Sequence, residues 1–207
     1  MNIEDYLSSK LIDFAIHNAG KKILDVGCAN GDYIKILQDN GFNCTGIDIN
    51  PEYIDKALEK GLNAYVMRGD NLDFPDNSFD TILLFEVLEH VENPLEVLKE
   101  LKRVAKKNIL ITVPNCTHFS ELKRYNLTYE HMLEKDHINF FTKKDLKDLL
   151  SKEFKYFKVV EEEPIPLTLL SVKNMPSWLR YFILLLNKFN IINDNIYYRL
   201  YAVIEVD

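Results

Sequence analysis

The sequence of 207 residues lacks the marks of a disulfide-rich or nucleic-acid-binding protein. Its three cysteines, Cys28, Cys44 and Cys116, lie far apart and form no C-x-x-C pair, so they are expected to be small core residues in a reduced compartment. The net charge of −7, with no concentrated basic stretch, disfavours nonspecific attraction to nucleic acid or anionic membranes. The first six residues contain acids and no apolar run, so no signal peptide is expected and the cytoplasm is the default location.

The sequence also lacks repeats, low-complexity tracts and linkers, and 47% of its residues are hydrophobic. We therefore expect one α/β domain over residues 1–207. The most apolar segment, 178–192, lies in a predicted helical insertion at about 164–195 and is interrupted by Arg180 and Lys188. It is too short and too charged to span a bilayer, which needs about 20 mostly apolar residues. The segment favours a helix packed on the sheet or on a partner subunit, with an interfacial helix in peripheral membrane contact as the alternative.

What the sequence does contain is a strand, a glycine-rich turn and a helix over residues 23–40, followed by a strand that ends at Asp48. Glycines at positions 27 and 31 let the backbone turn sharply and let a ligand approach it closely. A carboxylate at the tip of the second strand can accept two hydrogen bonds from a ribose diol. This pattern predicts a nucleoside-binding βαβ unit.

The third glycine of a dinucleotide-binding turn is missing, because position 32 is Asp32. A carboxylate at this helix N-terminus would repel a pyrophosphate. Asp25, two residues before Gly27, likewise favours a ligand with positive charge. S-adenosylmethionine fits, because it has a sulfonium and an α-ammonium group, no phosphate, and a ribose diol for Asp48. A short-chain NAD-dependent oxidoreductase is the first rival, and it is disfavoured by Asp32 and by the lack of a Tyr-x-x-x-Lys pair after the fourth strand.

The segment Asp25–Gly31 resembles motif I of class I S-adenosylmethionine-dependent methyltransferases, usually D-x-G-x-G-x-G, and is similar to the type 11 and type 12 families. Ala29 replaces the middle glycine, which implies a negative φ there. Gly69–Leu72 and Phe79–Val91 resemble later segments in the same order, so the resemblance covers about residues 20–115. It implies a Rossmann-like, mostly parallel seven-stranded sheet flanked by helices, with the last strand antiparallel. It also implies an enzyme that uses S-adenosylmethionine and releases S-adenosylhomocysteine.

The resemblance assigns cofactor-binding roles residue by residue. It implies that the methionine end is bound by Asp25, Gly27 and Gly31, the ribose by Asp48, the adenine by Asp70, Asn71 and Leu72, and the region of the reacting methyl by Phe85 and Glu86. Cys28 and Ile49, which adjoin these residues, complete the predicted cofactor-binding set.

The segment after the fourth strand carries candidate catalytic residues. If a helix begins there, Glu86, Glu89 and His90 share one face and converge on a point, with His137 as a further donor. These residues resemble the E-x-x-E-H segments of small-RNA 3′-end methyltransferases and of ubiquinone-pathway O-methyltransferases. Two interpretations follow: His90 or His137 is a general base, which we prefer, or the four side chains hold a divalent metal.

The acceptor is identified less well than the donor. We expect methyl transfer to oxygen or nitrogen of a small molecule, with a slight preference for an apolar one because of the 178–192 segment. A metal-assisted RNA methyltransferase is an alternative that the acidic charge opposes, and a non-catalytic nucleoside-binding protein is another. An irregular stretch at about 114–140, with Tyr125 and Tyr129, is predicted to form a lid over the substrate.

Patterning predicts the remaining elements. Helices are expected from residue 3 to Gly20, from Asp32 to about Asn40, from Pro51, from Pro94 to about Ala105 and from Thr142 to Leu150; strands are expected at Lys22–Gly27, Cys44–Asp48, Ala64–Met67, Thr81–Phe85, Ile109–Val113, Tyr156–Glu161 and Tyr197–Val206.

Overall fold

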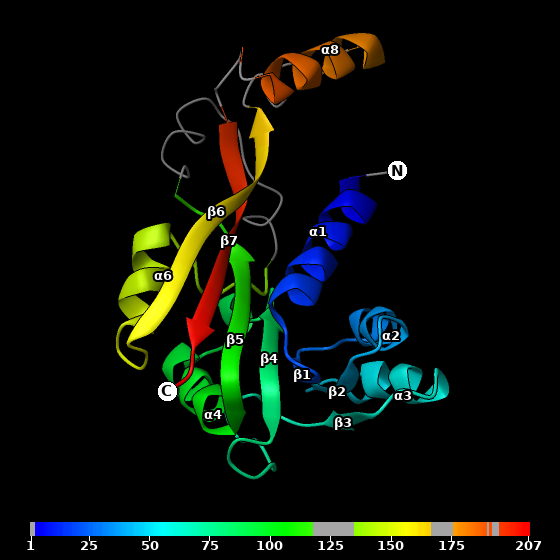
Figure 1. Ribbon diagram of the computed structural model, residues 1–207, viewed down its shortest axis with the longest axis vertical. Helices are drawn as coiled ribbons and strands as arrows, with labels where there is room; N and C mark the ends of the chain where they lie inside the picture. Colours follow the sequence, from blue (N-terminus) through cyan, green and yellow to red (C-terminus); the bar gives the residue numbers. More distant parts are fainter. Residues whose placement is uncertain (1–2, 118–134, 167–175, 190, 192–194) are drawn as a thin grey trace.

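A computed structural model describes residues 3–117, 135–166, 176–189, 191 and 195–207, and within them a single sheet of seven strands (Figure 1). The strand order is β3-β2-β1-β4-β5-β7-β6, and only β7 runs antiparallel to its neighbours. The strands are β1 (Lys22–Val26), β2 (Asn43–Asp48), β3 (Ala64–Val66), β4 (Phe79–Phe85), β5 (Ala105–Pro114), β6 (Tyr156–Pro166) and β7 (Asn195–Glu205). The fold class and the antiparallel last strand expected from the sequence are confirmed.

Helices cover both faces of the sheet, because the central strands are apolar on both sides. They are α1 (Ile3–Asn18), α2 (Asp32–Asp39), α3 (Pro51–Glu59), the 3₁₀ turn η1 (Leu88–His90), α4 (Pro94–Val104), α6 (Lys143–Leu150) and α8 (Ser177–Lys188). One core cluster packs α4 and α6 against the sheet, and a second packs α1, α2 and α3 against the other face. Among the described residues, no helix has both the length and the apolarity needed to cross a bilayer.

Predicted caps define two of these helices. The side-chain oxygen of Asn50 accepts the N–H of Glu52 at 2.9 Å, with Pro51 in the first turn of α3. Thr142 and Asp145 form a reciprocal capping box at the start of α6. Each side chain satisfies a backbone group that the helix end leaves open, which is why the sequence located these starts correctly.

The structure differs from the prediction mainly in the second half of the chain. β6 continues to Pro166 and not to Glu161. Proline is tolerated there because β6 is an edge strand, bonded on one side only to β7. The predicted insertion at 164–195 therefore begins within a strand. Most of the predicted lid, including Tyr125 and Tyr129, lies outside the described residues.

Candidate functional site

A cavity of about 520 Å³ lies at the carboxyl ends of β1, β2 and β4. Open α/β sheets place ligands at this edge, and the volume is within the range of about 300–1,000 Å³ usual for small-molecule sites. Residues from all three strand ends line it, among them Gly27, Asp48, Ile49, Glu86, Val87 and His90. The strand alternation that the sequence predicts thus brings five of the predicted site residues to one cavity.

The glycine-rich turn forms one wall of this cavity. Gly27 has φ +82°, and a Cβ there would overlap Cγ2 of Val87, so the position requires glycine. The prediction of a negative φ at Ala29 is wrong, because Ala29 has φ +45°. The Ala29 N–H donates to Oδ2 of Asp48 at 2.9 Å. This hydrogen bond holds the turn against the second strand, and alanine, with only a methyl side chain, adopts the left-handed conformation at a cost of about 1 kcal/mol.

Asp48 lies at the tip of β2 and contributes a carboxylate to the cavity. Oδ2 accepts from Ala29 and Oδ1 accepts the N–H of Asn50 at 2.9 Å. Two backbone donors therefore fix the plane of the carboxylate, and each oxygen retains a further lone pair for a ligand hydroxyl.

Asp25 lies on β1 behind the cavity, and its side chain is 2% exposed. Burial, and secondarily the negative charge of Asp48, raises the pKa of Asp25 to about 7. Within the described structure its Oδ2 has no hydrogen-bond partner. A buried carboxyl group with an unpartnered oxygen is stabilised by a cation or a hydrogen-bond donor that binds next to it.

Three other predicted residues are core residues. Gly31 is the N-cap of α2 with φ +79°, and Cys28 is buried in the cluster beneath α2 and α3. Phe85 ends β4 and contacts Phe14 of α1, with ring centroids 5.9 Å apart. None of these three residues lines the cavity.

The predicted adenine segment is engaged within the protein. Asp70 forms a bidentate pair with Arg68, at 2.7 and 2.9 Å. The N–H of Asn71 donates to the Arg68 carbonyl at 3.2 Å, and the N–H of Leu72 donates to Oε2 of Glu100 at 2.9 Å. Backbone contacts to adenine would require these bonds to be exchanged, so the assignment of the three residues stays a prediction.

Glu86 does not lie on a helix with Glu89 and His90, and that prediction is wrong. It precedes η1 with φ +54°, and its Oε2 lies 2.9 Å from Nε of Arg199. A single 3₁₀ turn is too short to align Glu86 with His90 on one face. Glu86 therefore lines the cavity, as His90 does, but it is a member of an ion-pair network.

This network, which sequence reasoning missed, is centred on Arg199 of β7. Its guanidinium donates to both carboxylate oxygens of Glu163 at 2.9 and 2.7 Å, and the Tyr201 hydroxyl donates to the same carboxylate at 2.6 Å. Glu163 and Tyr201 line a second cavity of about 410 Å³, between α1 and β6. The network thus separates two cavities. A single arginine within the apolar strand Asn195–Glu205 is the sequence signal that would have indicated it.

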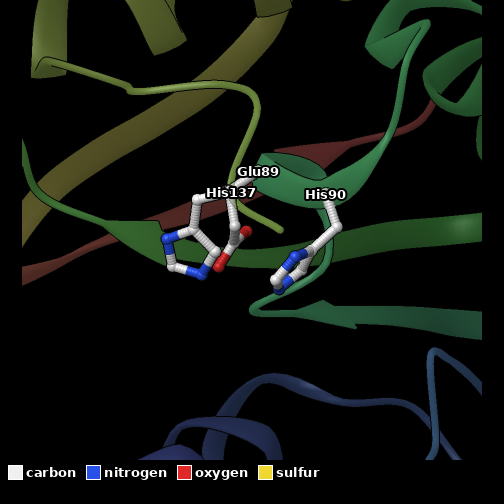
Figure 2. Close-up of side chains that lie close together, drawn as sticks. All are labelled: Glu89, His90 and His137. Carbon is white, nitrogen blue, oxygen red and sulfur yellow. The ribbon is translucent and has the colours of Figure 1, made fainter. Parts of the chain in front are cut away.

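Glu89, His90 and His137 form a separate cluster whose ligand atoms all lie within 4.8 Å of one another. Figure 2 shows the Glu89 carboxylate beside the His137 ring, with His90 on the same side of η1. The centroids of the two imidazole rings are 4.6 Å apart. Glu89 is 1% exposed and His137 is 8% exposed, whereas His90 is partly exposed and lines the cofactor cavity. One carboxylate and two imidazoles suit either proton transfer or a divalent cation.

Backbone and side-chain hydrogen bonds hold the two parts of this cluster together. The Glu89 carbonyl accepts the N–H groups of Ile138 and Asn139 at 2.9 Å. The Asn139 side chain donates to the carbonyls of Leu88 and Val91, at 3.2 and 2.7 Å. Asn139 thereby fixes His137 next to η1, a positioning role that sequence reasoning did not assign.

The cavity-facing histidine is oriented by Asp136. Nδ1 of His90 lies 3.2 Å from the Asp136 carbonyl oxygen and 3.4 Å from its Oδ2. Both oxygens are acceptors, so the neutral ring carries its proton on Nδ1 and keeps Nε2 as an acceptor. His90 is thereby poised to take a proton from a group in the cavity.

Comparison with known proteins agrees with this geometry. A sequence model of the methyltransferase domain family matches residues 2–155. The chain is 37% identical over 98 residues to a ubiquinone biosynthesis O-methyltransferase of Actinobacillus pleuropneumoniae. This match covers 42% of each of the two chains. It is 36% identical over 126 residues to a 2-methyl-6-phytyl-1,4-hydroquinone methyltransferase of Synechocystis. This second match covers 53% of this chain and 39% of the relative. The matches thus span less than half of these relatives.

Among solved structures, the fold resembles that of a SAM dependent methyltransferase from Archaeoglobus fulgidus. The TM-score is 0.72, the sequence identity is 19%, and the match covers 97% of this chain and 93% of the other. At this identity the likeness concerns the fold, including the β6 and β7 strands that follow the family match.

Proposed function

The chain belongs to the methyltransferase domain family, and from this premise we propose that it transfers a methyl group from S-adenosylmethionine to an oxygen or nitrogen of a small molecule. The observation that carries the proposal is the cavity at the carboxyl ends of β1, β2 and β4, with Asp48 and Glu86 in its wall and Asp25 behind it. The class I methyltransferase assignment made from the sequence agrees with the family and the fold.

The charges of the site fit this donor. Among the described residues that line the cavity there are three acids, Asp48, Glu86 and Asp136, and neither lysine nor arginine. The buried Asp25 adds a carboxyl group whose Oδ2 would accept a hydrogen bond from the ammonium group of the ligand. When bound, S-adenosylmethionine supplies the methyl group on a sulfonium that leaves as a thioether.

The residues of the chain would then position the acceptor and receive its proton. Gly27 lets the donor approach the backbone, and Asp48 holds a ribose diol by accepting its two hydroxyls. Alignment of acceptor, methyl and leaving group supplies up to about 7–11 kcal/mol of barrier reduction in favourable cases. Nε2 of His90 accepts the proton that an alcohol or amine loses as its oxygen or nitrogen gains the methyl.

We further propose an apolar acceptor, such as a substituted phenol or hydroquinone. The names of the two relatives, which act in ubiquinone and hydroquinone methylation, support this class. The residues that line the cavity beside His90 also include Val87, Val91 and Val97. Such side chains bind an apolar ring and exclude water from the base.

The donor assignment is tested by calorimetry with S-adenosylhomocysteine and NAD. We expect binding of S-adenosylhomocysteine and none of NAD. Asp48→Ala should weaken that binding at least tenfold, or about 1.4 kcal/mol, because the diol loses its acceptor. Asp55→Ala, on the exposed side of α3, is the matched control and should bind normally. A preference for NAD would overturn the donor, and normal affinity in Asp48→Ala would remove Asp48 from the ribose.

Metal-assisted transfer is a second candidate, favoured by the cluster of Glu89, His90 and His137. Two imidazoles and a carboxylate on adjacent segments are a donor set that suits a divalent transition metal. These residues would hold the ion, which would polarise the acceptor hydroxyl and lower its pKa. Glu86, the fourth residue predicted for this set, pairs with Arg199 and would join the other three only if that ion pair were exchanged.

One experiment separates the base from the metal, with acceptors identified by transfer of a radiolabelled methyl group to cell extract. For a base, His90→Ala lowers kcat by about 10²–10⁴-fold while a chelator has no effect on the wild-type enzyme. S-adenosylhomocysteine affinity in His90→Ala is the control for an intact donor site. Loss of activity on chelation, with recovery on adding a divalent ion, would instead establish metal-assisted transfer.

A further inference from the structure

Helix α8 displays an apolar stripe that the rest of the protein leaves exposed. The stripe consists of Trp178, Tyr181, Phe182, Leu185 and Phe189. Their spacing of three and four residues places all five on one side of the helix. Trp178 is 71% exposed, Tyr181 is 70% exposed and Phe189 is 66% exposed. Apolar patches of this kind on a folded protein mark interaction sites.

The exposed stripe is not the face by which α8 is attached. Ile183, on the other side of the helix, is 6% exposed, and Leu179 and Leu186 beside it are partly buried. These residues form the attached face, and α8 contacts β6. Because a separate set of residues anchors α8, the stripe is held outward on a fixed helix.

The charge of α8 is opposite in sign to that of the whole chain. Lys188 is exposed beside the stripe, Arg180 is exposed on the side of the helix away from it, and the helix contains no aspartate or glutamate. The chain as a whole has a net charge of −7. An anionic surface would therefore attract this helix while it repels the remainder of the molecule.

We propose that α8 is a membrane-docking helix that inserts its aromatic stripe into the headgroup region of an anionic lipid bilayer. Tryptophan, tyrosine and phenylalanine next to arginine and lysine are the residue types that interfacial helices use. The helix has 12 residues, so it is about 18 Å long and cannot span a hydrocarbon core of about 30 Å. It would lie in the plane of the interface.

The position of α8 gives this contact a consequence for the site. Figure 1 shows α8 at the end of the molecule to which the arrows of β5 and β6 point. The carboxyl ends of β1, β2 and β4 face the same way, because these strands run parallel to β5. The edge of the sheet that holds the cofactor cavity would therefore face the bilayer, where an apolar acceptor is dissolved.

A second copy of the chain suits the stripe less well than lipid does. Pairing two α8 stripes would place the two Lys188 side chains, one from each copy, at the edge of the contact. The helix offers no carboxylate to pair with them. Anionic headgroups supply the missing negative charges, which is why lipid is the occupant we infer.

Trp178 is the only tryptophan of the chain, so its fluorescence reports directly on α8. With vesicles of phosphatidylcholine and phosphatidylglycerol we expect a blue shift, quenching by brominated acyl chains, and co-sedimentation of the protein. Vesicles of phosphatidylcholine alone should bind much less. Removing a cation by Arg180→Ala or Lys188→Ala should weaken binding to the anionic vesicles by about fivefold each.

Two double variants test the stripe while keeping the reporter. Tyr181→Ser with Phe182→Ser should weaken vesicle binding at least about tenfold, because both rings leave the interface. Leu58→Ser with Tyr156→Ser removes two comparably exposed apolar side chains elsewhere and should bind normally. Absence of vesicle binding would overturn the proposal. So would a concentration-dependent blue shift without lipid, together with a dimer in analytical ultracentrifugation, which would identify a second copy as the occupant. None of these measurements requires the methyl donor.

Discussion

The structure contains two pairs of neighbouring acidic side chains, and among the described residues only one pair has a cation of the chain beside it. Asp25 and Asp48 lie at the ends of β1 and β2, close enough that the charge of Asp48 raises the pKa of Asp25. Glu86 and Glu163 share the guanidinium of Arg199. The chain thus supplies its own cation to the second pair and leaves the first beside a cavity to which no lysine or arginine contributes in the described part of the chain.

The difference separates a structural role from a binding role. A buried carboxylate that is paired and hydrogen-bonded keeps its charge, whereas one without a cation tends to take up a proton. Burial, together with the charge of Glu86, raises the pKa of Glu163, and Arg199 and the Tyr201 hydroxyl reduce that rise. Asp25 has no such cation among the described residues, and its pKa rises to about 7. We infer that the cation missing from the first pair is the one that the ligand carries.

The largest test of this comparison removes the internal cation. Arg199→Met leaves the buried Glu163 and the partly buried Glu86 without their counter-ion, and we expect the free energy of unfolding to fall by about 3–5 kcal/mol. Denaturant unfolding measures the change. Adding Glu163→Gln to the variant should restore part of the loss, because it removes one of the two unpaired charges.

An exposed pair provides the control for this experiment. Arg68 forms a bidentate pair with Asp70, but its side chain is 70% exposed. Arg68→Met should therefore change the free energy of unfolding by no more than about 1 kcal/mol. Equal effects of the two arginine substitutions would show that the Arg199 network is no more structural than a surface ion pair.

The first half of the chain was predictable because local patterns and backbone rules determine it. The strand alternation from Lys22 to Phe85 and the cap at Asn50 agree with the structure, and the cap at Thr142, another local pattern, is confirmed in the second half. Ala29 was predicted wrongly because its φ depends on a hydrogen bond to Asp48, nineteen residues away in sequence. The sequence gives no direct sign of such a partner.

The candidate catalytic cluster was predictable only in part. The residue types at 89, 90 and 137 were named, and the structure brings these three together. Glu86 is not brought together with them, since spacing on an assumed helix could not reveal a 3₁₀ turn or the distant Arg199. Contacts between segments more than a hundred residues apart, such as Glu86 with Arg199, are set by strand order and register, which local sequence does not specify.

A smaller test acts on the unpaired acid itself. Because the pKa of Asp25 is raised in the folded state from near 3.9 to about 7, its protonated form contributes stability that is complete below about pH 4. This contribution is lost as the pH rises through 7. Asp25→Asn removes that dependence, so its free energy of unfolding relative to wild type should increase by about 2 kcal/mol between pH 5 and pH 7.5.

The same substitution should have the opposite effect on binding. The asparagine offers no charge to the α-ammonium of S-adenosylhomocysteine, so affinity above pH 7 should fall although the ligand-free protein becomes more stable. Unfolding and calorimetry at matched pH values measure both quantities, with the exposed Asp55→Asn as control. If Asp25→Asn lost stability at pH 7.5 and kept full affinity, Asp25 would be a structural acid like Glu163. The contrast between the two carboxylate pairs would then have no connection with the ligand.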